Sequence, residues 1–398
     1  MTTPIPGGLP RAAPEGLVAC VLLAFLATAG LFYVNIMPAL VAGLIDGLGF
    51  TKRQAGFVGS ANVYGAACGA LVAVFLVSRF PWRRIEVVAL SLLLLLDLVS
   101  TQVTAAGPLI ALRFVHGFVG GISVGIGLAV MARTKVPDRA FGMLLTVQYG
   151  AGGLGVMFLP RLAHQFGPQV LFLALAAFTL ITLLMLPFLA EYPPRDRGPV
   201  LAGKPEAVRR IPLFKTLVAV FLFQASNMGM SAFIIPLGRY YGLEDTFISN
   251  TLGFASWIGV LGSVAVIWMA GRQGRAVPIA VALVATLVGI SAFLRSDAAW
   301  VFIAANAVTA ITWSFLIPYF FGMCADFDPA GRSATMAGFF SKMGLASGPA
   351  IAALLLGRDN YGLLITVSLI GLGLCGVAVL GPARLLDLGR RAPSPVRD

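Results

Sequence analysis

The sequence predicts an all-α membrane protein with twelve transmembrane helices in two six-helix bundles. Three observations lead to this fold class. The chain of 398 residues is 59% hydrophobic and only 11% charged, its apolar runs are long, and similar segments recur in its two halves. A soluble domain needs more polar surface than this. Because lipid offers the backbone no hydrogen bonds, and because the apolar runs are unbroken rather than alternating, we expect helices rather than a barrel.

Each expected span has about 20 residues, which is the length that a helix needs to cross the hydrocarbon core. The spans lie at 16–44, 55–77, 85–104, 108–131, 141–160, 168–189, 212–237, 250–270, 277–294, 299–321, 333–356 and 361–380. The first apolar run is too long for a signal peptide and lacks a charged start, so we expect it to stay uncleaved.

The longest polar stretch separates six spans from six. It reads "EYPPRDRGPVLAGKPEAVRRIP", and its Pro, Gly and charged residues predict a linker. The expected organisation is a cytoplasmic N-terminal tail at 1–15, an N-terminal six-helix bundle at 16–190, a central cytoplasmic loop at 191–212, a C-terminal bundle at 213–380 and a basic cytoplasmic tail at 381–398.

The basic residues indicate the orientation in the membrane. With the N-terminus inside, 20 of the 28 lysines and arginines fall on the inner side, six on the outer side and two, Arg113 and Lys342, within spans. This bias follows the positive-inside rule. We therefore expect both termini in the cytoplasm, in a bacterial inner membrane. The net charge of +12 is then a topology signal, and no aromatic-basic pattern predicts nucleic-acid binding.

The sequence lacks the motifs that mark several other classes of protein. The chain has two histidines, His116 and His164, and no HExxH, CxxC or Walker sequence. The sequence therefore predicts no enzyme, no metal site and no cofactor, and it disfavours an ATP-driven pump. A channel is disfavoured because no ring-forming motif occurs. A receptor or a structural membrane protein stays open, although repeated halves with buried polar residues favour a carrier.

Three pairs of segments recur at nearly one offset across the linker. "GLGFTKRQAGFVGSAN" pairs with "GLEDTFISNTLGFASW" at an offset of 195, "TVQYG" with "FSKMG" at 194, and "RFVHG" with "NAVTA" at 193. Together they indicate a duplicated six-helix unit. Carriers built from two such halves bind their substrate between the halves, near the middle of the membrane.

Twelve spans in two repeats around a central loop resemble the major facilitator superfamily. The family's loop after span two reads Gly-x-x-x-Asp-Arg-x-Gly-Arg-Arg, and here "VAVFLVSRFPWRR" keeps Arg79 and Arg83, with Ser78 in place of the acid. In the second half "GRQGR" supplies Arg272 and Arg275, again without the acid. The resemblance implies that these arginines act as a gating loop that latches the cytoplasmic ends of helices.

A second motif of the family occurs in span four. The drug and proton-coupled members carry Arg-x-x-Gln-Gly there, and this chain reads "RFVHG", with Arg113, then His116 in place of Gln, then Gly117. The Gly-Pro pair that antiporters carry in span five is absent. The resemblance implies a secondary active transporter that works by alternating access.

Asp97 and Arg113 are expected to form an ion pair. A charge in the membrane needs a partner or a purpose. Asp97 lies roughly 10 Å from the outer end of span three and Arg113 roughly 8 Å from that of span four, at 1.5 Å per residue. His116 is one turn from Arg113, and the reference pKa of a histidine side chain lies near neutral pH. We predict proton coupling at these three residues. The alternative for Asp97 and Arg113 is an ion pair that only joins two helices. The alternative for His116 is a side chain that only forms hydrogen bonds between helices. Asp97 is the only acid that we expect inside a span.

Lys342 lies within the apolar stretch "FFSKMGLASGPAIAALLLG", roughly 14 Å into span eleven. Its counterpart in the repeat is Gln148. We expect both to face a central cavity, where Lys342 receives a substrate carboxylate; the alternative is a lysine with a water shell. The further predicted substrate-binding residues are polar residues within spans, each with the alternative role of joining helices: Arg113, Asn306, Asn35, Gln224, Asn227 and Trp313.

The sequence thus predicts a secondary transporter that moves a small organic anion, with a carboxylate, across the plasma membrane, coupled to protons or by exchange. The alternative is a proton-coupled exporter of drugs or amphipathic molecules, and lipids or neutral solutes stay open. The expected partners are the lipid bilayer, a small-molecule substrate and protons, with no nucleic acid, and we expect a monomer.

Overall fold

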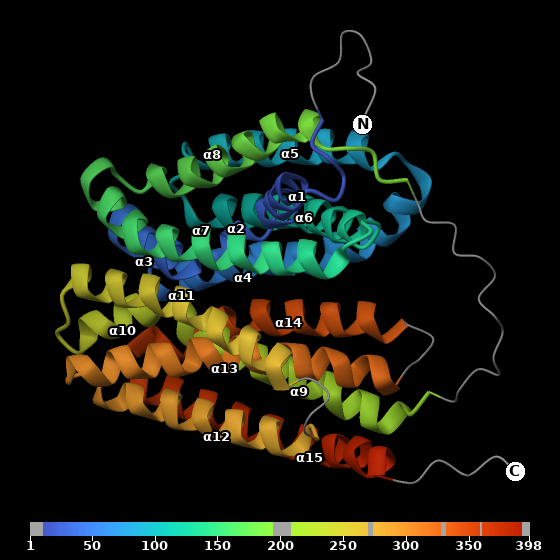
Figure 1. Cartoon of the computed structure of the whole chain (residues 1–398). Coiled ribbons are helices and arrows are strands. Elements are labelled where there is room, and N and C mark those ends of the chain that lie inside the picture. Colours follow the sequence, from blue (N-terminus) through green and yellow to red (C-terminus); the bar gives the residue numbers. More distant parts are fainter. Residues whose placement is uncertain (1–10, 194–207, 270–273, 328–331, 359, 392–398) are drawn as a thin grey trace, which may run out of the picture. The chain divides into compact units, whose positions relative to one another are not determined.

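The computed structural model describes residues 11–193, 208–269, 274–327, 332–358 and 360–391. Every regular element in these ranges is a helix. The chain forms two compact units, Met1–Val200 and Leu201–Asp398. Each unit is a helical bundle (Figure 1). The all-α fold that the sequence predicts is therefore confirmed.

Among its described residues, the N-terminal unit contains eight α-helices and one short 3-10 helix. They are α1 (Leu17–Ala29), α2 (Phe32–Asn35), α3 (Met37–Leu48), α4 (Lys52–Arg79), α5 (Trp82–Ser100), α6 (Ala106–Met131), α7 (Pro137–Phe166), α8 (Gln169–Met185) and η1 (Leu186–Phe188).

The C-terminal unit contains seven α-helices and two short 3-10 helices among its described residues. They are α9 (Arg210–Ala232), α10 (Ile234–Tyr240), α11 (Asp245–Met269), α12 (Ala276–Ala292), η2 (Phe293–Arg295), α13 (Ala299–Phe327), α14 (Arg332–Leu355), η3 (Leu356–Arg358) and α15 (Tyr361–Arg391).

Within the described ranges, ten helices are long and apolar enough to cross a membrane. Two further expected spans are not among these ten helices. The span at 85–104 corresponds to α5, which has 19 residues and carries four charged side chains. The first expected span is divided into α1, α2 and α3. With these two, the helices account for the twelve predicted spans.

The first span of each unit breaks a few residues before a proline. In the N-terminal unit the helix is interrupted at Ile36 and resumes as α3, with Pro38 in its first turn. In the C-terminal unit α9 ends at Ala232 and α10 resumes after Phe233, before Pro236. Proline has no backbone N–H, and its ring clashes with the carbonyl four residues earlier, so each proline fits the first turn of a new helix but not an unbroken one.

Corresponding helices of the two units have the same packing partners. α4 packs against α6 as α11 packs against α13, α5 against α8 as α12 against α15, and α1 against α7 as α9 against α14. The duplicated six-helix unit that the sequence predicts is therefore seen in the packing within each unit.

Glycines allow α4 and α6 to approach closely. A Cβ atom added at Gly65 or Gly69 of α4 would collide with the backbone of α6, and one added at Gly117 or Gly121 of α6 would collide with the backbone of α4. Small residues spaced four apart are typical of tightly packed membrane helices. This contact brings Asn62, whose carbonyl lies against Gly117, next to the polar residues of α6.

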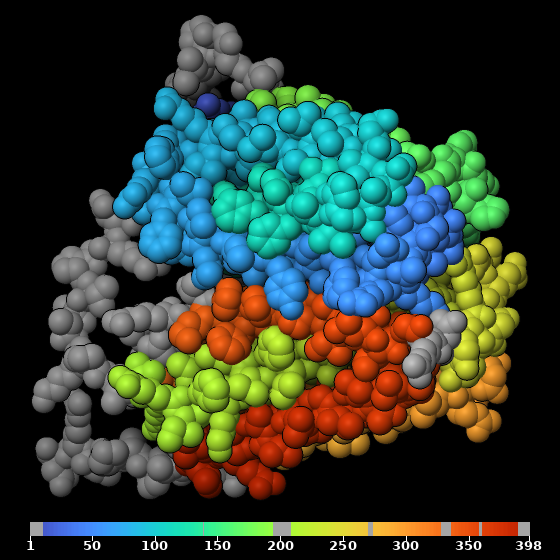
Figure 2. Space-filling view, turned by 180° about the vertical axis from the view of Figure 1, so that it is seen from behind, coloured from blue at the N-terminus to red at the C-terminus, as the bar shows by residue number. Residues whose placement is uncertain are grey.

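Large apolar side chains cover the outward faces of the helices. Val377 is 80% exposed, Ile267 77% and Trp300 73%. Figure 2 shows one such face of each unit, formed by closely packed side chains. Such faces suit contact with lipid chains, and the polar residues discussed below lie beneath them.

Candidate functional site

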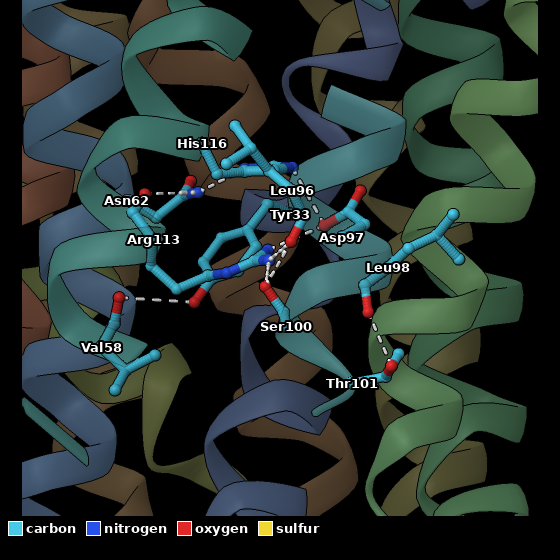
Figure 3. A network of polar contacts seen from close by, with 10 residues as sticks. All are labelled: Tyr33, Val58, Asn62, Leu96, Asp97, Leu98, Ser100, Thr101, Arg113 and His116. Carbon is cyan, nitrogen blue, oxygen red and sulfur yellow. Dashed lines mark hydrogen bonds and ion pairs between the residues drawn. The ribbon is translucent and has the colours of Figure 1, made fainter. Parts of the chain in front are cut away.

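A network of buried polar side chains joins α5 and α6 in the N-terminal unit (Figure 3). Arg113 of α6 donates from Nη1 to Oδ1 of Asp97 on α5 at 2.8 Å. Its Nη2 donates to the carbonyl of Leu96 at 3.2 Å and also to the hydroxyl of Ser100. Asp97 and Arg113 are both 0% exposed. The ion pair that the sequence predicts is thus present, and its part in proton coupling stays a prediction.

His116 contacts the same carboxylate oxygen from one turn further along α6. Its Nε2 lies 3.1 Å from Oδ1 of Asp97, and its Nδ1 lies 2.8 Å from Nδ2 of Asn62 on α4. Nδ2 of Asn62 also donates to the carbonyl of Arg113 at 3.3 Å, and a carbonyl can only accept. The amide nitrogen therefore faces α6. It follows that Nδ1 of His116 accepts and Nε2 donates to Asp97, which is the pattern of the neutral ring.

Aromatic rings enclose the guanidinium group of Arg113. Its central carbon lies 4.9 Å from the ring centre of Phe172 and 5.9 Å from that of Tyr33. The hydroxyl of Tyr33 donates to the carbonyl of Val58 at 3.4 Å. Stacked rings stabilise a cation where water is excluded. One oxygen of Asp97, Oδ2, has no hydrogen-bond partner among the described residues, so the network keeps one unused acceptor.

A second buried acid was missed by the sequence analysis. Glu86 of α5 is 0% exposed, so the expectation that Asp97 is the only acid within a span is wrong. Its Oε2 accepts a hydrogen bond from the hydroxyl of Ser123 on α6 at 2.8 Å. Glu86 follows Arg83 and Arg84, and such charges commonly mark the edge of a membrane. The signal that could have found it is its spacing of eleven positions from Asp97, about three helical turns, which puts both acids on one face of α5.

In the C-terminal unit, Lys342 lies near the middle of α14 and is partly exposed. It makes no hydrogen bond or ion pair with the residues that the structure describes. The side chain before it, Ser341, accepts from Nε2 of Gln224 on α9 at 2.7 Å. Oε1 of Gln224 accepts from Nε1 of Trp313 on α13 at 2.7 Å. The structure thus brings together two predicted binding residues, Gln224 and Trp313, beside the helix turn that carries Lys342.

The other predicted binding residues have simpler contacts. Asn227 and Asn306 donate to carbonyls one turn earlier in their own helices, at 2.9 Å and 2.8 Å. Asn35 donates from Nδ2 to the carbonyl of Gln148 at 3.3 Å, within the N-terminal unit. Because Gln148 and Lys342 belong to different units, their predicted position on either side of a cavity stays a prediction.

Arg83 ties the start of α5 to η1 and to the residues that directly follow η1. Its Nε lies 2.7 Å from Oε1 of Glu191, and its guanidinium donates to the carbonyls of Leu186 and Ala190, each at 3.1 Å, and of Leu189. Cationic donors suit the free carbonyls and the negative dipole at a helix C-terminus. The contact therefore holds two helix ends of one unit together.

Tyr192 extends this contact to two neighbouring segments. Its hydroxyl donates to the carbonyl of Pro14 at 3.1 Å, and its own carbonyl accepts from Nη1 of Arg133 at 3.3 Å. Burial raises the pKa of the Tyr192 phenol and lowers the pKa of Arg133. The raised pKa of Tyr192 agrees with a phenol that acts as the donor in its hydrogen bond to Pro14.

The other predicted gating residues, Arg79, Arg272 and Arg275, do not share one kind of contact. Arg79 is exposed at the end of α4, and Arg272 lies outside the described residues. Arg275 places Nη2 2.7 Å from Oδ2 of Asp326 on α13. The carboxylate of Asp387 on α15 accepts from the backbone N–H of Arg275 and of the next residue, at 2.7 Å and 2.9 Å, and so caps α12. Like Arg83, Arg275 makes its described contacts inside its own unit.

The described residues hold no group of three or more His, Cys, Asp or Glu side chains that could bind a metal ion. Away from the helix ends, the polar contacts described above are the Asp97–Arg113–His116 network, the Glu86–Ser123 hydrogen bond and the Gln224–Trp313–Ser341 contacts next to Lys342.

The fold is shared with several solved transporters. The chain is similar to the nucleoside transporter NupG (13% identity, TM-score 0.72, covering 93% of this chain and 99% of that one). It is similar to the peptide transporter POT in complex with sulfate (13% identity, TM-score 0.70, covering 95% and 98%). It is also similar to a bacterial homolog of the human lysosomal transporter Spinster (14% identity, TM-score 0.64, covering 94% and 98%). At these identities the likeness shows the fold alone.

No curated protein matches the sequence. The family model of the Major Facilitator Superfamily matches residues 19–353, which is most of the chain and includes the helices that carry the network and Lys342. The chain therefore belongs to the major facilitator superfamily and is a multi-pass membrane transporter, not an enzyme.

Proposed function

We propose that this secondary transporter moves a small organic anion with a carboxylate group, coupled to protons. The observation that carries this proposal is Lys342, a cation near the middle of a membrane-spanning helix with no ion-pair partner in the described part of the chain. A charge at the centre of a bilayer costs about 3 kcal/mol on insertion scales and more in simulations, so it needs a partner or a purpose. A substrate carboxylate would supply that partner.

The surroundings of Lys342 suit a positioned ligand. Gln224 receives a hydrogen bond from Trp313 and gives one to Ser341, so three helices are tied together one residue away from the lysine. Fixed neighbours reduce the entropy that is lost when a ligand is bound. We propose that Lys342 contacts the carboxylate, that Gln148 adds a hydrogen bond, and that Trp313 and Gln224 hold the position of α14.

Arg113 is less suited to bind the substrate directly. Its guanidinium donates to Asp97, to the Leu96 carbonyl and to Ser100, and it is 0% exposed. A bound anion would have to compete with an existing carboxylate for the same donors. We therefore assign Arg113 to the ion pair and derive the preference for anions from Lys342.

Proton coupling is assigned to Asp97, Arg113 and His116. A proton on Asp97 would remove the negative charge that both Arg113 and His116 contact. Breaking one side of a buried ion pair costs about 3–5 kcal/mol, which is enough to shift the balance between two conformations of the bundle. We propose that protonation of this network changes the packing of α5 and α6 and so couples proton movement to transport.

The experiment is uptake into proteoliposomes that contain the purified protein. A panel of radiolabelled mono- and dicarboxylates is tested with and without an imposed pH gradient, next to an ethidium efflux assay, with protein-free liposomes as the control. Uptake of at least one carboxylate that the pH gradient stimulates supports the proposal. Ethidium efflux without carboxylate uptake would instead favour the drug exporter. From the distribution of basic residues we further propose that both termini lie in the cytoplasm of a bacterial inner membrane. We also propose that the protein is a monomer.

A further inference from the structure

We propose that Glu86 is a second proton-binding site of this transporter, separate from the Asp97 network and nearer the expected cytoplasmic end of α5. This goes beyond the proposed function and does not depend on the identity of the substrate. The proposal begins from the position of the carboxyl group, which is 0% exposed in a membrane-spanning helix.

The carboxyl group of Glu86 has one hydrogen-bond partner. Ser123 donates to Oε2 at 2.8 Å, while Oε1 is buried and has no partner among the described residues. A carboxylate without a cation is costly to bury, whereas a neutral acid needs only hydrogen bonds. Since Ser123 occupies Oε2, a bound proton would lie on Oε1. In the binding step one proton joins Oε1 and the carboxylate becomes a carboxylic acid, and release reverses the step.

No described charged group faces Glu86 from the helices packed against α5. Those helices are α6 and α8. α8 contains no titratable residue, and α6 contains only Arg113 and His116, which both contact Asp97. On α5 itself, Arg83 is bound to Glu191 and Arg84 is exposed. The proton is therefore the partner that fits a single buried carboxyl here.

Glu86 and Asp97 are separated by apolar packing. Both acids lie on one face of α5, with the completely buried Leu90 and Leu93 between them. The described polar groups form no chain from one acid to the other. The two acids can therefore hold protons independently, each on its own part of the α5–α6 contact.

A further polar group lies between Glu86 and the expected cytoplasmic end of α5. Trp82 is one helical turn before Glu86, on the same face, and its Nε1 is buried without a hydrogen-bond partner in the described ranges. An indole N–H and a carboxyl oxygen that both lack partners, one turn apart, provide a donor and an acceptor along this side of the helix. The nearer end of α5 is the one that begins at Trp82, four residues from Glu86, so we infer that the Glu86 proton exchanges on that side.

The test is infrared spectroscopy of the purified full-length protein in lipid, titrated across the pH range in which it stays folded. The probe is the C=O stretch of protonated carboxyl groups. We expect Glu86→Gln to lose a pH-dependent component of this band, equivalent to one proton per protein, while Glu244→Gln, the same change at an exposed acid, keeps it. Identical titrations of this component in wild type and a folded Glu86→Gln protein would overturn the proposal, because Glu86 would then never exchange its proton.

A second variant keeps the test decisive if Glu86→Gln does not fold. Ser123→Ala removes the hydroxyl that donates to Oε2 and leaves the acid in place. We expect it to move the midpoint of the same band component while the rest of the titration is unchanged. If the band component of Ser123→Ala had the same midpoint as that of the wild-type protein, this result would contradict a proton site at Glu86.

Discussion

The amide nitrogen of Asn62 lies 2.8 Å from Nδ1 of His116, and this contact fixes the imidazole with its other nitrogen toward Asp97. The two residues come from α4 and α6, which meet through glycines that leave almost no space between the backbones. The geometry of the histidine is therefore set by helix packing rather than by its own helix.

Replacing Asn62 by Leu should destabilise the N-terminal unit. The change keeps the size of the side chain but leaves Nδ1 of His116 without its described donor, and an unsatisfied buried polar group costs about 1–3 kcal/mol. A lower melting temperature in detergent, measured by intrinsic fluorescence, is the expected result. Gln102→Leu, at an exposed amide near the end of α5, is the control and should melt like wild type. Equal melting of the two variants would contradict the role given to Asn62.

The pair of Asp97 and Arg113 should show strong coupling. Each single change, Asp97→Asn or Arg113→Gln, leaves one buried charge without its partner, at a cost of about 3–5 kcal/mol. The double variant removes both charges and should recover a large part of the folded yield, measured as the monodisperse peak in fluorescence-detected gel filtration. If the double variant rescued neither single variant, the two side chains would not act as a pair.

Two glycines of the same helix should respond in opposite ways. A Cβ at Gly117 would collide with the backbone of Asn62, whereas a Cβ at Gly107 would meet no atom within 4 Å. Gly117→Ala should therefore destabilise the protein by about 1–3 kcal/mol through overpacking, while Gly107→Ala should be neutral or slightly stabilising. Thermal melting of the two variants side by side checks this. Equal effects would mean that α4 and α6 do not pack through these glycines.

The two arginines on either side of the α4–α5 loop, Arg79 and Arg83, should differ as well. Arg83 binds Glu191 and carbonyls of η1 and of the residues that directly follow η1, while Arg79 is exposed. Arg83→Gln should lower the melting temperature and Arg79→Gln should not. Glu191→Gln should have only part of the effect of Arg83→Gln, because the carbonyl contacts remain. A larger effect at Arg79 than at Arg83 would contradict the contacts and favour a latch at Arg79.

Much of the architecture could be predicted from the sequence, because it depends on properties that a single helix carries. Apolar length gave the spans, and Asp97 and Arg113 follow one another across a short turn, so their pairing needed no knowledge of distant contacts. The breaks before Pro38 and Pro236 follow from the chemistry of proline, although the sequence analysis did not predict them.

The rest depends on how one helix is rotated against another. The partner of His116 is Asn62, which lies on a helix that is not adjacent in the sequence, and its register is set by contacts at Gly65 and Gly117. Glu86 was missed because its position close to two arginines is typical of a membrane edge, whereas burial by α6 and α8 gives it an interior position. The partner of His116 has no signal in the local sequence pattern, and the signal for Glu86 is limited to its spacing of eleven positions from Asp97.

The central claim is that Lys342 receives the carboxylate of the substrate. The most direct measurement is uptake, into proteoliposomes, of the carboxylate that the wild-type protein transports, by Lys342→Ala, Lys342→Arg and the control Lys215→Ala, an exposed lysine of the same unit. The account predicts no uptake by Lys342→Ala, partial uptake by Lys342→Arg and full uptake by Lys215→Ala, with all three folded by gel filtration. Wild-type uptake by a folded Lys342→Ala protein would contradict it.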